Sequence, residues 1–161
     1  MYKKLIIIAI VLFTIISCNK KTYDPGATST VKASNEWWVN LYLDGAPQYG
    51  KFAKITTYNT AGNTDSIWID DLGDIWQFKV RAVFNKDSLT FSAPNAANYW
   101  PNYPITVNVQ KGKIMLNKAK SATGLPTDSI YFKISFSDDT TPGTVYEVKG
   151  TGRTLWGADD Y

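Results

Sequence analysis

From residue 36 to the end of the chain, apolar and polar residues alternate with a period of two. The alternation is clearest over residues 36–43, 75–84 and 129–137, where Trp, Val, Leu, Ile or Phe recurs at alternate positions. Successive side chains of a β-strand point to opposite faces, so this pattern predicts half-buried strands. No stretch of this region shows a convincing helical spacing. We therefore expect an all-β domain.

Turn-forming residues separate the expected strands. Asp44-Gly45, Lys111-Gly112 and Pro142-Gly143, together with polar stretches at 71–74 and 85–87, are typical of hairpin connections. Sequential hairpins with one apolar face favour an up-and-down antiparallel β-barrel of about eight strands, because closure removes exposed edges. A two-sheet β-sandwich is the alternative. The predicted strands are 36–43, 53–59, 66–70, 75–84, 88–93, 105–110, 113–117, 129–137 and 144–152.

The N-terminus has the features of a bacterial lipoprotein signal. Lys3 and Lys4 precede an apolar run over 5–16, which is shorter than the roughly 20 residues of a membrane span and fits a signal peptide. The run ends in Ile15-Ile16-Ser17-Cys18, a lipobox pattern in which the cysteine receives the acyl chains. We therefore predict a signal peptide over 1–17, lipidation of Cys18, and anchoring to the membrane through it.

The predicted domain organisation follows from this signal. Residues 18–34 are rich in Lys, Thr, Ser, Pro and Gly, and predict a lipidated flexible tether. Residues 35–161 form the barrel domain. Asn19 after the cysteine favours the outer membrane, so we expect a cell-envelope lipoprotein on the periplasmic face or the cell surface.

Composition excludes several chemistries. The chain has no histidine and one cysteine, which excludes Ser-His and Cys-His dyads, imidazole-bound metals and an internal disulfide. The formal charge of +3 is too small to indicate a nucleic-acid partner. At 44% hydrophobic and 14% aromatic, the chain has enough apolar residues for a core. We assign no metal and no cofactor, and expect a monomer.

Several segments resemble one protein family. They are 36–39, 57–60, 66–73, 76–80, 89–91, 127–132 and 136–139. This set is similar to the lipoprotein family named "lipid-binding putative hydrolase". The resemblance implies a calycin-like, or lipocalin-like, β-barrel with an apolar interior, and it supplies no catalytic residue. Calycins in general also place an Arg of the last strand over a Trp of the first. This looser resemblance implies that Arg153 packs on Trp37 or Trp38.

Aromatic residues supply the candidate ligand site. On the strands they either fill a plain core or line a cavity, whereas those between residues 99 and 104 close a barrel mouth, stack on a sugar, or cover the core. The candidate ligand-binding residues are Trp76, Phe78, Phe91, Tyr99, Trp100, Tyr103, Phe132 and Phe136.

Two acidic pairs and three serines complete the candidates. The pairs Asp70/Asp71 and Asp138/Asp139 fit turn chemistry, a calcium site or carboxylate catalysis. No serine-nucleophile motif is present, so the catalytic residues are unknown and we favour a protein that is not an enzyme. Ser66, Ser88 and Ser129 each follow Asp and precede an aliphatic residue, the O-glycosylation pattern of exported proteins in some gut anaerobes.

These observations predict a membrane-anchored lipoprotein whose barrel binds an apolar or amphipathic small molecule, such as a fatty acid. A glycan-binding accessory lipoprotein and a carboxylate-dependent hydrolase are the alternatives.

Overall fold

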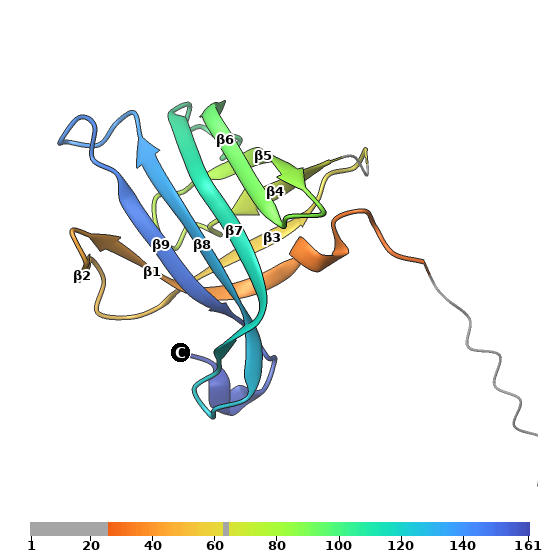
Figure 1. Ribbon diagram of the computed structural model, residues 1–161. Helices are drawn as coiled ribbons and strands as arrows, with labels where there is room; N and C mark the ends of the chain where they lie inside the picture. The colour runs from red at the N-terminus through yellow and green to blue at the C-terminus, as the bar shows by residue number, and fades with distance from the viewer. Residues whose placement is uncertain (1–25, 63–64) are drawn as a thin grey trace, which may run out of the picture.

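The computed structural model describes residues 26–62 and 65–161. Extended strands dominate it, as the alternation predicted, and two short 3-10 helices lie near its ends (Figure 1). The elements are η2 Val31–Ala33, β1 Asn35–Leu43, β2 Ala46–Pro47, β3 Ala53–Asn59, β4 Ser66–Asp70, β5 Lys79–Asn85, β6 Thr90–Ala97, β7 Thr106–Lys120, β8 Pro126–Phe136, β9 Tyr146–Gly152 and η3 Gly157–Asp159.

The strands close into a barrel. Apart from the two-residue β2, each strand pairs antiparallel with its neighbour in the chain, and β9 pairs back with β1. The N-terminal half of β1 pairs with β3 and an overlapping, more C-terminal part pairs with β9. The predicted eight-stranded up-and-down barrel is therefore confirmed over the β-sandwich alternative.

Two parts of the strand prediction are wrong. Residues 75–78 alternate like a strand but belong to the loop between β4 and β5, in which Gln77 has a φ of 54°. Lys111-Gly112 is not a hairpin turn. It forms a β-bulge inside β7, which joins the predicted strands 105–110 and 113–117 into one. A bulge and a hairpin turn both use residues with a positive φ, which is 54° at Lys111. The same pair of residues in the sequence can therefore form either one.

Side chains fill the barrel interior. Trp37, Phe78, Phe84 and Phe132 are among its largest fully buried residues. Phe91 and Phe132 meet edge to face, with ring centroids 5.7 Å apart. The strand aromatics therefore form a packed core in this structure, which is the first of the two interpretations left open by the sequence.

The barrel has two distinct ends. The four loops 44–52, 71–78, 98–105 and 137–145 form what we call the loop end. The opposite end holds the segments 26–34, 60–62, 86–89 and 121–125 and the C-terminal segment 153–161, and we call it the arginine end after Arg153. In Figure 1 the β7–β8 hairpin extends past the barrel at the arginine end, beside the C-terminus.

The chain enters the barrel at the arginine end. Ahead of β1, Thr30 and Ala33 are buried, and the Thr57 hydroxyl donates a hydrogen bond to the Ala33 carbonyl. The last residues before position 35 therefore pack on the barrel.

Candidate functional site

The loop between β4 and β5 is built around the carboxylate of Asp71. Its Oδ1 accepts hydrogen bonds from the backbone N–H groups of Gly73 and Phe78, both at 2.9 Å. Its Oδ2 accepts from Ile75 and Trp76, at 3.2 and 2.7 Å. Burial raises the pKa of the Asp71 carboxyl, while these four N–H donors act in the opposite direction. The Asp71 side chain thus accepts the backbone N–H groups of a loop segment that has no partner strand.

At the loop end, Trp76 covers the buried Phe136 ring. Its indole lies flat on the Phe136 ring, with centroids 4.4 Å apart and an interplanar angle of 4°. The indole N–H donates to Asp138 Oδ1 at 3.1 Å, and the Tyr103 hydroxyl donates to Asp138 Oδ2. The hydrogen bond to Asp138 raises the pKa of Tyr103, which keeps the hydroxyl protonated as a donor. We call Trp76, Tyr103 and Asp138 the aromatic cap.

Tyr146 extends the same cluster. Its ring centroid lies 6.0 Å from that of Trp76, and its hydroxyl donates to Asp139 Oδ2 at 2.9 Å. Burial, followed by the neighbouring Asp139, raises the pKa of Tyr146 to about 12. The cap therefore presents aromatic faces together with hydroxyl groups that remain neutral at physiological pH.

Asn98 holds the loop 98–105 against this cluster. Its Oδ1 accepts from the N–H groups of Lys79 and Trp100, at 2.8 and 3.1 Å. Its Nδ2 donates to the carbonyls of Gln77 and Tyr103, at 3.0 and 2.9 Å. One amide side chain thus joins the two loops that carry Trp76 and Tyr103.

Two of the pockets in the described residues lie among the loops of this end. One, of about 340 Å³, is lined by Gly73, Ile75, Trp76, Gln77 and Tyr103. It is a shallow hollow beside the aromatic cap, open to solvent.

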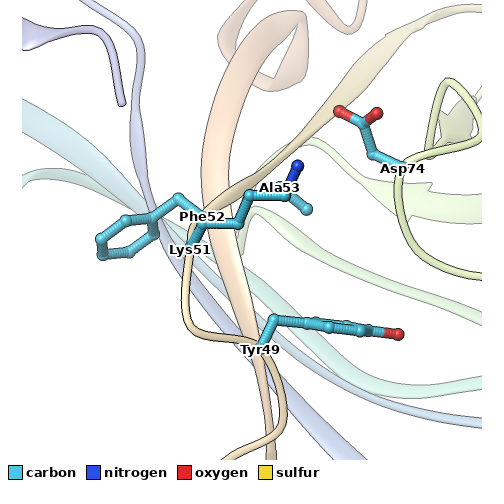
Figure 2. Close-up of a pocket in the computed structure, with 5 residues that line it drawn as sticks. All are labelled: Tyr49, Lys51, Phe52, Ala53 and Asp74. Carbon is cyan, nitrogen blue, oxygen red and sulfur yellow. The ribbon is translucent and has the colours of Figure 1, made fainter.

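The second pocket, of about 40 Å³, is lined by Tyr49, Lys51, Phe52, Ala53 and Asp74. Tyr49 and Lys51 extend toward the side of Asp74, whereas the Phe52 ring points the other way (Figure 2). The Tyr49 hydroxyl donates to the Ile75 carbonyl at 3.4 Å, which links the loop 44–52 to the loop of Trp76. This pocket is too small for a lipid chain. Its residue Tyr49 helps to hold the loop that lines the larger pocket.

Comparison of the sequence with known protein families agrees with this architecture. The model of a family described as "Lipid-binding putative hydrolase" matches residues 22–157. The chain belongs to that family. No curated protein matches it. Membership of a lipid-binding family and a barrel with an apolar interior together support a lipid-binding function.

The predicted ligand-binding residues of this lipid-binding family member divide into three groups. Phe78, Phe91, Phe132 and Phe136 are buried inside the barrel. Trp76 and Tyr103 meet at the aromatic cap, directly above Phe136.

Tyr99 and Trp100 lie apart from the cap. Tyr99 is exposed on the barrel's outer side, where it meets Trp68 edge to face at 4.9 Å. Trp100 packs beside Gly73, since a Cβ added at that glycine would lie 3.2 Å from the indole. The structure therefore brings six of the eight candidates to the core and its cap.

The sequence pattern does not single out Tyr49 or Asn98, two polar residues of this site. It marks Asp138 as half of an acidic pair but does not predict that this carboxylate accepts the hydrogen bonds of the cap. Asn98 precedes the aromatic loop, and a polar residue in such a place can be read only as a generic turn signal. The contacts that join separate loops reach partners distant in the chain, 62 residues away for Asp138 and Trp76.

Three members of the acidic pairs, Asp70, Asp71 and Asp139, accept local backbone hydrogen bonds in turns, whereas Asp138 is the acceptor of the aromatic cap. Asp70 Oδ1 accepts from the Leu72 N–H at 3.1 Å, and Asp139 Oδ1 accepts from the Thr141 N–H at 2.9 Å. Within residues 26–62 and 65–161, no cluster of three or more His, Cys, Asp or Glu side chains is placed to hold a metal ion.

Arg153 makes the contact that the calycin resemblance implied. Its guanidinium carbon lies 5.8 Å from the centroid of Trp38, a distance typical of a cation–π contact. It also forms ion pairs with Glu36 and Asp160, each at 2.6 Å. Trp37 points into the barrel instead, and its indole N–H donates to Thr57 at 2.8 Å.

The three candidate glycosylation serines differ in accessibility. Ser88 is exposed in the connection between β5 and β6. Ser66 is buried, with its hydroxyl bonded to Thr60 and Arg81. Ser129 is half-buried in β8, between Met115 and Thr151.

The predicted signal peptide and Cys18 lie outside the described residues. In the part of the chain that the structure describes, no helix has the length and apolar character needed to cross a membrane.

Proposed function

We propose that this protein is a membrane-anchored lipoprotein of the cell envelope that binds one apolar or amphipathic molecule, such as a fatty acid, at the loop end of its barrel. The lipobox ending at Cys18 supports the anchor and a place at the outer membrane. The family match supports the lipid ligand.

The aromatic cap carries the proposal. Trp76 is half-buried. Its indole stacks on the Phe136 ring and donates one hydrogen bond to the exposed carboxylate of Asp138. Asp71 and Asn98 meanwhile fix the loop backbones. The Trp76 side chain can therefore swing away without unfolding its loop. This movement uncovers Phe136 and, behind it, Phe78, whose ring centroid lies 5.7 Å away.

An acyl chain then takes the place of the indole. It runs from the hollow beside Trp76 onto the Phe136 and Phe78 rings, which gives it an apolar surface shielded from water. The hydroxyl groups of Tyr103 and Tyr146 lie at the rim, where they can bond a polar headgroup. Carboxylates of Asp74 and Asp138 are exposed at the same end. A neutral headgroup, as in a monoacylglycerol, should therefore bind more tightly than a free fatty carboxylate.

The test is a titration of the protein, purified without detergent, with a fluorescent fatty acid and with its monoacylglycerol competitor. We expect micromolar affinity. Trp76→Ala removes the side chain that has to move aside, so this variant should bind several-fold more tightly, because the closed state no longer reduces the apparent affinity. Trp68→Ala removes an indole from the barrel's outer side and is the matched control. An absence of binding, or equal affinities for the two variants, would contradict the proposal.

A further inference from the structure

Exposed apolar side chains gather at the arginine end, opposite the proposed ligand site. Ten large hydrophobic residues are exposed within the described chain, and six of them lie at this end or on the β7–β8 hairpin that extends from it. These six are Val31, Leu116, Leu125, Leu155, Trp156 and Tyr161. A scattered exposed leucine needs no explanation, but a cluster on protruding loops marks an interaction surface.

Leu155 and Trp156 are the most exposed members. Leu155 is 74% exposed and Trp156 62%. Leu155 also has a φ of 60°, a left-handed conformation that is unfavourable for a leucine.

A buried carboxylate brings this segment to the tip of the β7–β8 hairpin. Asp159 Oδ1 accepts from the Thr123 N–H, and Oδ2 accepts from the Thr154 hydroxyl, both at 2.7 Å. The hairpin tip and the C-terminal turn lie side by side in Figure 1. Leu125 of the tip and Leu155 and Trp156 of the turn therefore belong to one surface.

Exposed lysines lie at the same end of the barrel. Lys118 and Lys120 on the hairpin and Lys32 in η2 are exposed, and within the described residues none of them forms an ion pair. Of the acidic groups at this end, Asp160 pairs with Arg153 and Asp128 accepts the Asn117 N–H, whereas Asp87 is exposed in the connection 86–89. Leu and Trp side chains flanked by free lysines are typical of surfaces that lie in a membrane interface.

We propose that the arginine end docks directly on an anionic lipid bilayer, with Leu125, Leu155 and Trp156 among the headgroups and Lys118 and Lys120 facing lipid phosphates. The inference rests on the proposed anchor at Cys18. Among the described residues the first buried one is Thr30, and the stretch of chain from Cys18 to Thr30 spans at most about 40 Å. Anchor and docking surface then act on the same bilayer, and the ligand site points away from it.

Vesicle co-sedimentation tests the docking without the acyl chains. Residues 26–161 hold the whole barrel and its core, so the chain from residue 18 carrying Cys18→Ser contains the folded unit. We expect it to bind vesicles of phosphatidylcholine with phosphatidylglycerol, and the double variant Leu155→Ser/Trp156→Ser to bind at least about tenfold more weakly. Lys118→Gln/Lys120→Gln should weaken binding to the anionic vesicles. Val145→Ser removes an exposed apolar side chain from the loop end and should bind like the parent.

Several outcomes would overturn the docking. Failure of the parent chain to bind anionic vesicles is one, and equal losses in the double variant and Val145→Ser is another. A third is a parent that is dimeric and becomes monomeric in the double variant, because the surface would then join two copies.

Separate measurements report on the proposed function. Processing of the full chain with and without globomycin, and with Cys18→Ala, tests the anchor. Fatty-acid titration of the double variant tests the ligand site and shows that the barrel is intact. Loss of vesicle binding with both of these preserved assigns the effect to docking alone.

Discussion

Asp71 provides the hydrogen bonds that a neighbouring strand would otherwise supply to the loop carrying Trp76. One buried carboxylate accepts four backbone N–H groups from residues 73–78, and no other residue type offers four acceptor positions on so short a side chain. The position of Trp76, and with it the aromatic cap, therefore depends on a residue that does not touch the proposed ligand.

Asp71→Asn should destabilise the protein by about 2–4 kcal/mol, because the new NH₂ group faces two buried N–H donors that lose their acceptor. Asp74→Asn is the control. Asp74 is exposed and accepts one N–H, from Lys54 at 3.2 Å, so its replacement should cost less than about 0.5 kcal/mol. Urea denaturation of both variants measures the difference. Equal free energies of unfolding would show that Asp71 does not organise the loop.

At the scale of the strands, the period of two predicted β3 and β4 to the residue, since each is bounded by turn residues. The same period failed at residues 75–78, where the side chains alternate but the backbone bonds to Asp71. It also split β7 at Lys111-Gly112. A glycine after a polar residue can serve as a turn or as a bulge, and only the partner strand distinguishes them.

The partner strand requires a glycine at 112. A Cβ there would lie 2.5 Å from the Phe91 carbonyl oxygen and would also meet the Phe91 ring. Gly112→Ala should therefore cost about 1–3 kcal/mol through overpacking. Gly157→Ala is the matched control, because no atom lies within 4 Å of its added Cβ. Thermal unfolding of both variants checks this, and a Gly112→Ala protein as stable as the control would refute the close packing.

At the scale of the whole molecule, carboxylates hold the start of β1 and the C-terminal segment together at the arginine end. Arg153 joins Glu36 of β1 to Asp160, and Asp159 joins the C-terminal turn to the β7–β8 hairpin. Burial alone would raise the pKa of Asp159, but hydrogen bonds from Thr154 and Thr123 outweigh it and lower that pKa to about 2.

This lowered pKa predicts an acid-sensitive contact. The ionised Asp159 stabilises the fold at pH values above the ordinary carboxyl pKa of about 4, and the contribution is lost as the pH falls toward about 2. The chemical shift of the Thr123 amide, which donates to Asp159, should change with pH through this transition. In the Asp159→Asn variant that pH-dependent change should be absent. Asp87→Asn, in an exposed turn at the same end, should leave it unchanged. An identical Thr123 profile in the Asp159→Asn protein would contradict the assignment.

The sequence by itself determined the properties that depend on neighbouring residues: the alternation of the strands, most of the hairpin turns, the all-β class and the lipobox at Cys18. Only the tertiary structure decided which of Trp37 and Trp38 faces the core, because adjacent residues of a strand point to opposite sides and either side can be inside. It also decided that Trp76 rests on Phe136, a residue 60 positions away. Such contacts depend on strand register and barrel closure, which arise from bulges and packing among distant segments, and no local pattern encodes them.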